Sequence, residues 1–271
     1  MVWLIALLFS SLITFLINII NKGSVLLIVI EFLLFFIVAV LLYILFMELC
    51  GLILIKKDEK VIKPKKIFKH LTLSMCKFAC TLFGVKVIVK GKDKIDFSKR
   101  YLFVSNHQSN LDPVILIKAF PKLNLTFIMK KELMKIKIIS RYLTAAGFYS
   151  LDRNNNREGL KTILTTIEAA KVRSIAVFPE GTRSRSGELL PFRDGIFKVS
   201  QKADCGIIVC SLDNTRNIKN RFPFRKTKVV IEVCDVISPE LSREKTTVEL
   251  GEIANKMIGE SIIKNREEYK L

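Results

Sequence analysis

Histidine is scarce in this sequence, and its cysteines do not stand in the patterns that bind metals. His70 and His107 are the only histidines, and none of the six cysteines belongs to a C-x-x-C pair. The spacing of a zinc site is therefore absent, and no disulfide framework is indicated. We interpret the cysteines as small buried hydrophobic residues in a reducing compartment.

Sequence patterns for nucleotide and nucleic-acid binding are also missing. Neither G-x-G-x-x-G nor G-x-x-x-x-G-K-[ST] occurs, so dinucleotide and P-loop nucleotide chemistry has no support. No helix-turn-helix and no RNP-like aromatic strand is recognisable, so nucleic-acid binding lacks a module. The chain also has no internal repeat and no low-complexity linker.

Charged residues are nearly absent from the first 55 positions, where only Lys22, Glu31 and Glu48 carry a charge. In the whole chain of 271 residues, acidic residues are outnumbered by 44 Lys and Arg to 25 Asp and Glu, a formal net charge of +19. One apolar segment is thus joined to one basic segment that is long enough for a single domain. A surface this basic predicts an anionic partner: a membrane, an acidic protein, a phosphorylated substrate or nucleic acid.

The first 55 residues are expected to form a membrane-anchoring helical hairpin. Met1–Ile20 has no charged side chain, and a helix of that length is about 30 Å long, enough to cross a bilayer core. A short turn at Asn21–Ser24 precedes a second apolar run, Val25–Met47, which only Glu31 interrupts. The lysines that follow favour a cytoplasmic location for the globular domain. A hairpin that enters one leaflet only is the alternative.

Residues 56–84 are expected to be a basic linker followed by an interfacial helix. Lys66–Phe83 has apolar side chains at roughly helical spacing, with lysines between them. This helix either lies in the membrane interface next to anionic head groups or packs on the globular domain.

Residues 85–271 alternate between short β-rich runs and helical stretches, which is typical of an α/β domain. We therefore predict a mixed, largely parallel sheet that is flanked by helices and preceded by the membrane hairpin. The expected strands are Val85–Val89, Tyr101–Ser105, Leu125–Met129, Phe148–Leu151, Ser174–Phe178, Ile207–Leu212 and Lys228–Cys234. The expected helices are Pro113–Phe120, Lys131–Ala146, Arg157–Lys171, Ile196–Lys202 and Leu241–Lys264.

The strand Tyr101–Ser105 leads into a segment that contains His107 and Asp112. Asp112-Pro113 followed by apolar residues predicts the N-cap and first turn of a helix. Five positions apart, the two side chains cannot meet on one helix, but they can meet across a strand–turn–helix junction. A carboxylate bonded to one ring nitrogen leaves the other free as a base. A plain helix cap and an ordinary loop histidine are the alternatives.

Two further strand ends carry arginines, and ligands bind at strand ends in α/β sheets. Phe178–Ser184, of sequence Phe-Pro-Glu-Gly-Thr-Arg-Ser, presents Arg183, a rigid fork suited to phosphate. Gly181 permits close backbone approach, and Thr182 adds a hydroxyl donor. The other strand end carries Arg153. A hydroxyl-capped turn and a surface ion pair are the simpler interpretations of these two segments.

Together these segments resemble the 1-acyl-sn-glycerol-3-phosphate (lysophosphatidate) acyltransferase family of glycerolipid acyltransferases. The order and rough spacing match at His107-x4-Asp112, at Gly147 followed by Asp152-Arg153, and at Phe178–Ser184. The resemblance covers roughly residues 68–233. It implies that the histidine takes the proton of the acceptor hydroxyl and that the aspartate orients the histidine.

The resemblance also implies a pocket for the glycerol phosphate, made by the two arginine-bearing motifs. The sequence departs from the family at Ser150, where an aromatic residue is usual, and in Ile207–Leu212, which lacks the usual proline. The residues expected to form the phosphate pocket are Arg153, Glu180, Gly181, Thr182 and Arg183.

The expected function is that of a membrane-bound acyltransferase. It would move a fatty acyl group from an acyl thioester, acyl-CoA or acyl carrier protein, to 1-acyl-sn-glycerol 3-phosphate, giving phosphatidate in phospholipid biosynthesis. No metal or other cofactor is implied, and anionic membrane lipids are expected partners, with the catalytic domain on the cytoplasmic face. One alternative is another acceptor, glycerol 3-phosphate or another lysolipid. A second is a non-catalytic, membrane-tethered basic module that binds anionic lipid or nucleic acid.

Overall fold

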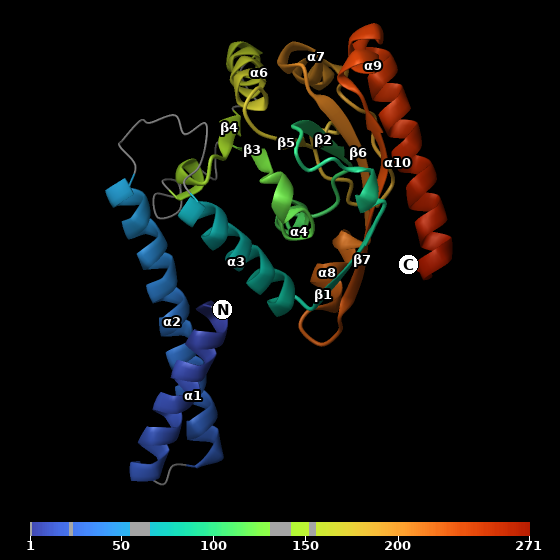
Figure 1. The fold of residues 1–271 in the computed structure, drawn as a ribbon. Coiled ribbons are helices and arrows are strands. Elements are labelled where there is room, and N and C mark those ends of the chain that lie inside the picture. The colour runs from blue at the N-terminus through green and yellow to red at the C-terminus, as the bar shows by residue number, and fades with distance from the viewer. Residues whose placement is uncertain (1, 22–23, 55–65, 131–141, 152–155) are drawn as a thin grey trace.

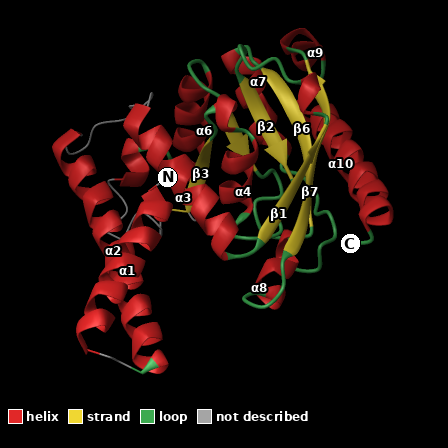
Figure 2. Cartoon of the chain, turned by 60° about the horizontal axis from the view of Figure 1, so that its bottom comes forward, coloured by secondary structure: helices red, strands yellow, loops and turns green. Residues whose placement is uncertain are grey.

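The computed structural model of the chain describes residues 2–21, 24–54, 66–130, 142–151 and 156–271. It consists of a long helical hairpin beside an α/β domain whose sheet has helices on both faces (Figures 1 and 2). The lysine run between residues 56 and 65 and most of the helix expected over 131–146 lie outside the described residues.

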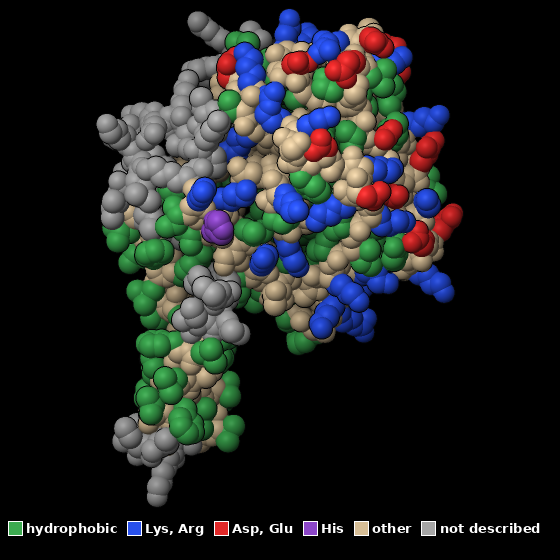
Figure 3. Space-filling model, viewed as in Figure 1, with side chains coloured by type: hydrophobic (Ala, Val, Ile, Leu, Met, Phe, Trp, Pro, Cys, Tyr) green, Lys and Arg blue, Asp and Glu red, His purple; other side chains and the backbone are tan. Residues whose placement is uncertain are grey.

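The hairpin consists of α1 (Val2–Asn21) and α2 (Val25–Leu54), as the sequence predicts. Within α2, Val25–Phe46 is long and apolar enough to cross a membrane, and only Tyr43 of its side chains is buried. Hydrophobic side chains cover the hairpin surface (Figure 3). The amide of Asn18 in α1 donates to Glu31 Oε2 in α2 at 2.9 Å. The one acidic side chain of the second apolar run therefore has a hydrogen-bond partner across the hairpin.

Helix α3 (Lys66–Leu82) packs between the hairpin and the domain. Its Phe68 is fully buried in the domain core, and the rings of Phe78 and Phe36 of α2 lie 6.2 Å apart. These contacts favour the packed-helix alternative. Ile67 and Leu82 remain 41% and 50% exposed, so a membrane contact along this exposed side stays a prediction.

The domain is built on one seven-stranded sheet of order β1-β7-β6-β2-β5-β3-β4. All neighbouring strands run parallel except β6 and β7, which are antiparallel. The predicted mixed, largely parallel sheet is confirmed. The strands are β1 (Val85–Lys90), β2 (Tyr101–Ser105), β3 (Thr126–Lys130), β4 (Tyr149–Leu151), β5 (Ile175–Val177), β6 (Gly206–Asp213) and β7 (Thr227–Ile237).

Two hydrophobic cores lie on the two faces of this sheet. Alternating side chains of β2 divide between them: Phe103 packs with α3 and α4 on one face, and Leu102 and Val104 pack with α6, α7 and α10 on the other. This alternation follows from the period of two along a strand. The helices are α4 (Asp112–Ala119), α6 (Asn156–Ala170), α7 (Lys198–Ala203), α8 (Ile218–Arg221), α9 (Pro239–Glu244) and α10 (Thr247–Tyr269), and the short 3-10 turns are Lys92–Lys94, Pro121–Leu123, Asp194–Phe197 and Thr215–Asn217.

The single helix expected over Leu241–Lys264 is wrong, because α9 and α10 are separate helices. Thr246 caps α10 with a reciprocal capping box: its hydroxyl accepts from Glu249 N, and the Glu249 carboxylate accepts from Thr246 N. The extended backbone at this cap ends α9 before α10 begins.

Sheet topology brings five chain segments to one edge. Because β2, β5 and β6 are parallel neighbours, their carboxyl ends meet at this edge. β7 is antiparallel to β6 and parallel to β1, so the starts of β1 and β7 lie at the same edge. Residues after Ser105, Val177 and Asp213 are therefore neighbours of the residues that precede Val85 and Thr227.

Candidate active site

His107 lies just beyond the carboxyl end of β2, and Asp112 begins α4. His107 Nδ1 and Asp112 Oδ2 are 2.7 Å apart. The junction between strand and helix therefore brings the two side chains together, although they are five positions apart. With Nδ1 engaged by the carboxylate, the geometry leaves Nε2 as the nitrogen that can take up a proton.

Asp112 is fully buried and does not cap its own helix. Leu111 occupies the N-cap position of α4, so the expected helix-cap role of Asp112 is not what the structure has. Instead, Asp112 Oδ2 turns back and accepts from Gln108 N at 2.6 Å and from Ser109 N at 2.8 Å. These two amides fix the carboxylate against His107. Its other oxygen, Oδ1, is buried and has no hydrogen-bond partner among the described residues.

The backbone of His107 is fixed by the turn that follows β5. Glu180 is only 4% exposed, and its carboxylate accepts from His107 N at 2.6 Å and from Leu190 N at 3.3 Å. Burial, helped by the nearby charge of Asp112, raises the pKa of Glu180 to about 7, against the opposing effect of the two backbone donors. These contacts fit a positioning role for Glu180 better than direct contact with a phosphate, which an acidic group would repel.

The imidazole of His107 is held from its face as well. The ring of Phe178 stacks on it, with centroids 4.1 Å apart and an angle of 11° between the planes. Phe178 in turn stacks on Phe127 of β3 at 5.7 Å. The aromatic contacts and the carboxylate leave the ring little rotational freedom, so a base at this position is preorganised.

The turn after β5 carries three more of the predicted site residues, Gly181, Thr182 and Arg183. Gly181 has a φ of +69°, so a side chain there would be strained, and its Cβ, 2.8 Å from Arg193 Nε, would displace the Arg193 side chain. Ser184 N donates to the carbonyl of His107 at 2.8 Å, which joins the turn that carries Thr182 and Arg183 to the histidine loop. Arg153, the other predicted phosphate ligand, lies outside the described residues.

A cavity of about 620 Å³ opens beside the histidine loop, within the size range of small-molecule sites. Its lining is cationic, and the residues described by the structure show no ion pair to any of its Lys or Arg side chains. Phe83, Leu111 and Ile218 supply apolar surface. The four cations of the lining are Arg183, Arg185, Arg216 and Lys219.

Arg216 reaches this cavity across Gly187. Gly187 has a φ of +84°, and an added Cβ there would lie 2.5 Å from Arg216 Cζ. Glycine at this position thus lets the guanidinium lie against the backbone of the preceding turn. The structure thereby brings Arg216, from the segment after β6, to the same cavity as Arg183, from the segment after β5.

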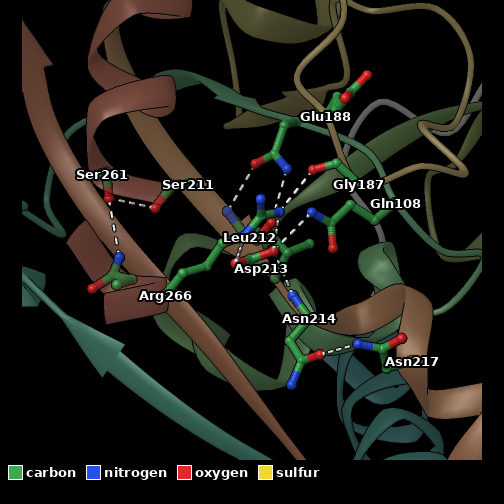
Figure 4. Close-up of polar contacts among 12 residues, drawn as sticks. Gln108, Gly187, Glu188, Ser211, Leu212, Asp213, Asn214, Asn217, Ser261 and Arg266 are labelled. Carbon is green, nitrogen blue, oxygen red and sulfur yellow. Dashed lines mark hydrogen bonds and ion pairs between the residues drawn. The ribbon is translucent and has the colours of Figure 1, made fainter. Parts of the chain in front are cut away.

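A charged network connects the loops that follow β2, β5 and β6 (Figure 4). Asp213, at the end of β6, accepts from Gln108 Nε2 at 3.0 Å. Arg266 of α10 donates to both Asp213 oxygens, at 2.7 and 3.1 Å, and to the carbonyl of Gly187 at 2.7 Å. Its bonds to Asp213 raise the pKa of the Arg266 guanidinium. Arg266 therefore ties the loops after β5 and β6 to the helix that covers the sheet.

The sequence interpretation missed Arg216, Lys219, Asp213 and Arg266. Arg216 was within reach of the same rule that singled out Arg183, because Asp213-Asn214-Thr215-Arg216 follows an apolar strand directly. For Arg266, a cation in a C-terminal helix, the sequence offered no comparable signal.

Comparison with known proteins gives matches over the segment that contains this candidate site. Residues 86–213 match the family model described as Acyltransferase, and this segment contains both His107 and the turn with Arg183. The similarity to acyltransferases that the sequence motifs predict is thus found over these residues. Among the described residues, no group of three or more His, Cys, Asp and Glu side chains is placed to hold a metal ion.

Several curated relatives are named 1-acyl-sn-glycerol-3-phosphate acyltransferase. A 1-acyl-sn-glycerol-3-phosphate acyltransferase of Saccharomyces cerevisiae is 32% identical over 183 residues, which cover 65% of this chain and 58% of the yeast protein. One of Salmonella typhimurium is 32% identical over 154 residues, covering 56% of this chain and 62% of the relative. The matches thus span less than two thirds of the relatives' length.

A solved structure shares the fold. The 1-acyl-sn-glycerophosphate (LPA) acyltransferase PlsC from Thermotoga maritima aligns with a TM-score of 0.63 and 23% identity, over 83% of this chain and 94% of that chain. The alignment extends well beyond the part matched by the family model. It supports the α/β architecture of the domain, and it includes much of the chain outside the segment matched by the family model.

Proposed function

We propose that this protein is a membrane-bound acyltransferase that acylates the free hydroxyl of 1-acyl-sn-glycerol 3-phosphate and so forms phosphatidate in phospholipid biosynthesis. The observation that carries the proposal is the His107–Asp112 pair, in which only Asp112 is fully buried, beside a cavity lined by four cations and three apolar side chains. This combination suits a substrate with an anionic head, an acyl chain and a hydroxyl to be deprotonated. The names of the curated relatives support the same reaction.

In the proposed reaction, His107 Nε2 takes the proton of the acceptor hydroxyl as that oxygen attacks the thioester carbonyl. The new C–O bond forms, the tetrahedral intermediate collapses, and the C–S bond breaks. The leaving thiolate receives the proton from the imidazolium. Asp112, held by the amides of Gln108 and Ser109, stabilises the imidazolium in between. The acyl group passes directly to the acceptor, so no acyl-enzyme is needed.

The phosphate of the acceptor is proposed to bind the cations at the cavity. Arg183 offers a bidentate fork, and Arg216 and Arg185 provide further donors from the same lining. Arg153 is proposed as another ligand from the second motif. Gly181 and Thr182 shape the turn that presents Arg183. We assign Glu180 to positioning of His107, on the basis of its two backbone contacts.

The donor is proposed to be an acyl thioester, carried by coenzyme A or by acyl carrier protein, with no cofactor in addition. Both carriers are acidic, so the net charge of +19 suits either. We further propose that the hairpin anchors the protein in a membrane rich in anionic lipid and that the catalytic domain faces the cytoplasm, where both carriers occur. A reporter fused after Leu271 tests this orientation.

The decisive experiment uses the purified full-length protein in detergent, a labelled acyl-CoA and a panel of acceptors. The panel contains lysophosphatidate, glycerol 3-phosphate, other lysolipids and uncharged monoacylglycerol. We expect lysophosphatidate to be the preferred acceptor. His107→Ala should lower kcat about 10²–10⁴-fold, the usual contribution of a general base.

His70→Ala is the matched control, because His70 is the only other histidine and lies exposed on α3. It should leave the rate unchanged. Activity of His107→Ala within a few-fold of the wild type would contradict the assignment of the base. Preference for another acceptor would keep the mechanism and change the substrate, and no transfer to any acceptor would favour a non-catalytic lipid-binding module.

A further inference from the structure

The segment between β6 and β7 ends in an unusually exposed aromatic loop. Phe224 is 93% exposed, the highest value among the large hydrophobic side chains that the structure describes. Its neighbours Arg221, Arg225 and Lys226 are exposed as well. From Asn214 to Val230 the sequence has six Lys or Arg and no Asp or Glu. An exposed aromatic ring within a purely cationic segment is suited to an anionic, partly apolar surface.

This loop is fixed to the end of α3. The ring of Phe222 packs on Phe83, with centroids 4.9 Å apart, and Thr227 N donates to the carbonyl of Gly84 at 2.9 Å. Leu82, one residue before Phe83, is 50% exposed. Phe224 therefore projects from an anchored loop, next to a helix end that itself presents an apolar side chain.

The loop lies on the side of the domain toward which the hairpin extends. In Figures 1 and 2 the hairpin and the turn after α8 reach beyond the same end of the α/β domain, and Lys and Arg side chains gather at that edge in Figure 3. Helix α3 connects the two, because Phe78 contacts Phe36 of the hairpin while Phe83 contacts the loop. A bilayer that holds the hairpin is therefore within reach of the loop.

The same loop borders the proposed active site. Lys219 and Asn220, at the start of the loop, line the cationic cavity, and so does Phe83, on which Phe222 packs. A surface that covers the loop would therefore also lie at the mouth of the cavity.

We propose that residues 219–226 are a second membrane contact, which inserts Phe224 into the interface of an anionic bilayer and places the cavity mouth against the lipid head groups. The inference rests on the proposed membrane attachment of the hairpin, and it does not depend on which acceptor is acylated. Each Lys or Arg held near an anionic bilayer strengthens the contact about fivefold.

The test uses single-tryptophan versions of the full-length chain in nanodiscs. Trp3 is the only tryptophan, so Trp3→Phe gives a silent background for Phe224→Trp, a substitution that leaves packing unchanged because the site is exposed. The matched reporter is Val248→Trp, which is 51% exposed at the start of α10, at the opposite end of the domain. The nanodiscs contain zwitterionic lipid alone or with anionic lipid, and brominated acyl chains serve as quenchers.

In anionic nanodiscs we expect the Phe224→Trp emission to shift to shorter wavelength and to be quenched more strongly than that of Val248→Trp. Arg225→Glu with Lys226→Glu should abolish the difference, whereas Lys198→Glu with Lys202→Glu on α7 makes the same charge change elsewhere and should preserve it. Equal, water-like emission from both reporters in a chain that is retained in nanodiscs would overturn the loop contact alone. A chain that is not retained would overturn the hairpin anchor too. In a further sample, acyl carrier protein is added to the same nanodiscs. If it shifts the Phe224→Trp emission to shorter wavelength and anionic lipid does not, the loop is a protein-docking site and the membrane contact is overturned.

Discussion

Replacing Asp112 by Asn tests the central pair with the smallest possible change of shape. The amide oxygen can take the place of Oδ2 and still accept from Gln108 N and Ser109 N. The amide nitrogen then occupies the position of Oδ1, which is buried and has no partner among the described residues. An unsatisfied buried donor costs about 1–3 kcal/mol, so we expect lower stability as well as lower activity.

The loss of activity can be estimated from the geometry of the pair. Asp112 Oδ2 and His107 Nδ1 are 2.7 Å apart, and the positive charge that develops on the imidazolium is shared with the rest of the ring. Two unit charges about 4 Å apart attract each other by about 4 kcal/mol at an effective dielectric constant of 20. Loss of this attraction corresponds to about 10³ in rate. We therefore expect kcat to fall about 10²–10³-fold, somewhat less than for His107→Ala, with little change in KM for the acceptor.

The assay is acyl transfer to lysophosphatidate at varied acceptor concentration, with thermal unfolding of the same preparations measured in parallel. Asp96→Asn is the control, because Asp96 is an exposed acid shortly before the start of β2. Among the described residues its carboxylate contacts only Ser98 and Lys99. If Asp112→Asn keeps kcat within threefold of the wild type while remaining folded, Asp112 is a structural support of the loop, and the electrostatic argument is refuted.

Two further predictions concern the neighbouring arginine and glutamate. Arg183→Ala should lower kcat/KM for lysophosphatidate about 10- to 100-fold, which corresponds to the loss of one charge-assisted hydrogen bond of about 1.5–3 kcal/mol. The loss of kcat/KM for monoacylglycerol should be much smaller. Equal losses on both acceptors would show that Arg183 has a structural role and does not recognise the phosphate. Because the pKa of Glu180 is raised from 4.5 to about 7 in the folded state, the native protein binds more protons than the unfolded chain between these values, so stability should fall as the pH rises through that window. Glu180→Gln should flatten this part of the dependence of unfolding temperature on pH, and an unchanged profile would show that other groups cause it.

The fold was largely accessible from the sequence because each element carries its own local signal. The buried strands are β-branched runs such as Ile207–Leu212 and Lys228–Cys234, and they differ from β6 and β7 only at their ends. A single helix was predicted over Leu241–Lys264 because the apolar spacing continues across the junction between α9 and α10. The signal for that break was present in the sequence, since Thr246 and Glu249 stand at capping-box spacing.

The site was accessible from the sequence where a local pattern marks its residues. His107 and Asp112 are five positions apart, and one strand–helix junction determines their contact. Arg183 and Arg216 are 33 positions apart, and they share a cavity because β5 and β6 both lie beside β2. The order of strands in the sheet depends on long-range packing, which local periodicity does not encode. The sequence can therefore mark Arg216 as a strand-end arginine, but it does not show that Arg216 shares a cavity with Arg183.

The position of β7 gives the remaining link between fold and proposed function. If β7 ran parallel to β6, the chain would have to cross to the other end of the sheet after Asp213, and the segment with Phe224 would leave the active-site edge. Because β7 is antiparallel to β6, the connection stays at that edge, and the parallel pairing of β1 with β7 brings the end of α3 there too. A lysolipid in a bilayer presents its phosphate and free hydroxyl at the head-group level. The proposed function therefore requires a base, cations and membrane contacts at one edge. This strand order places His107, the cations of the cavity and residues 219–226 at the same edge.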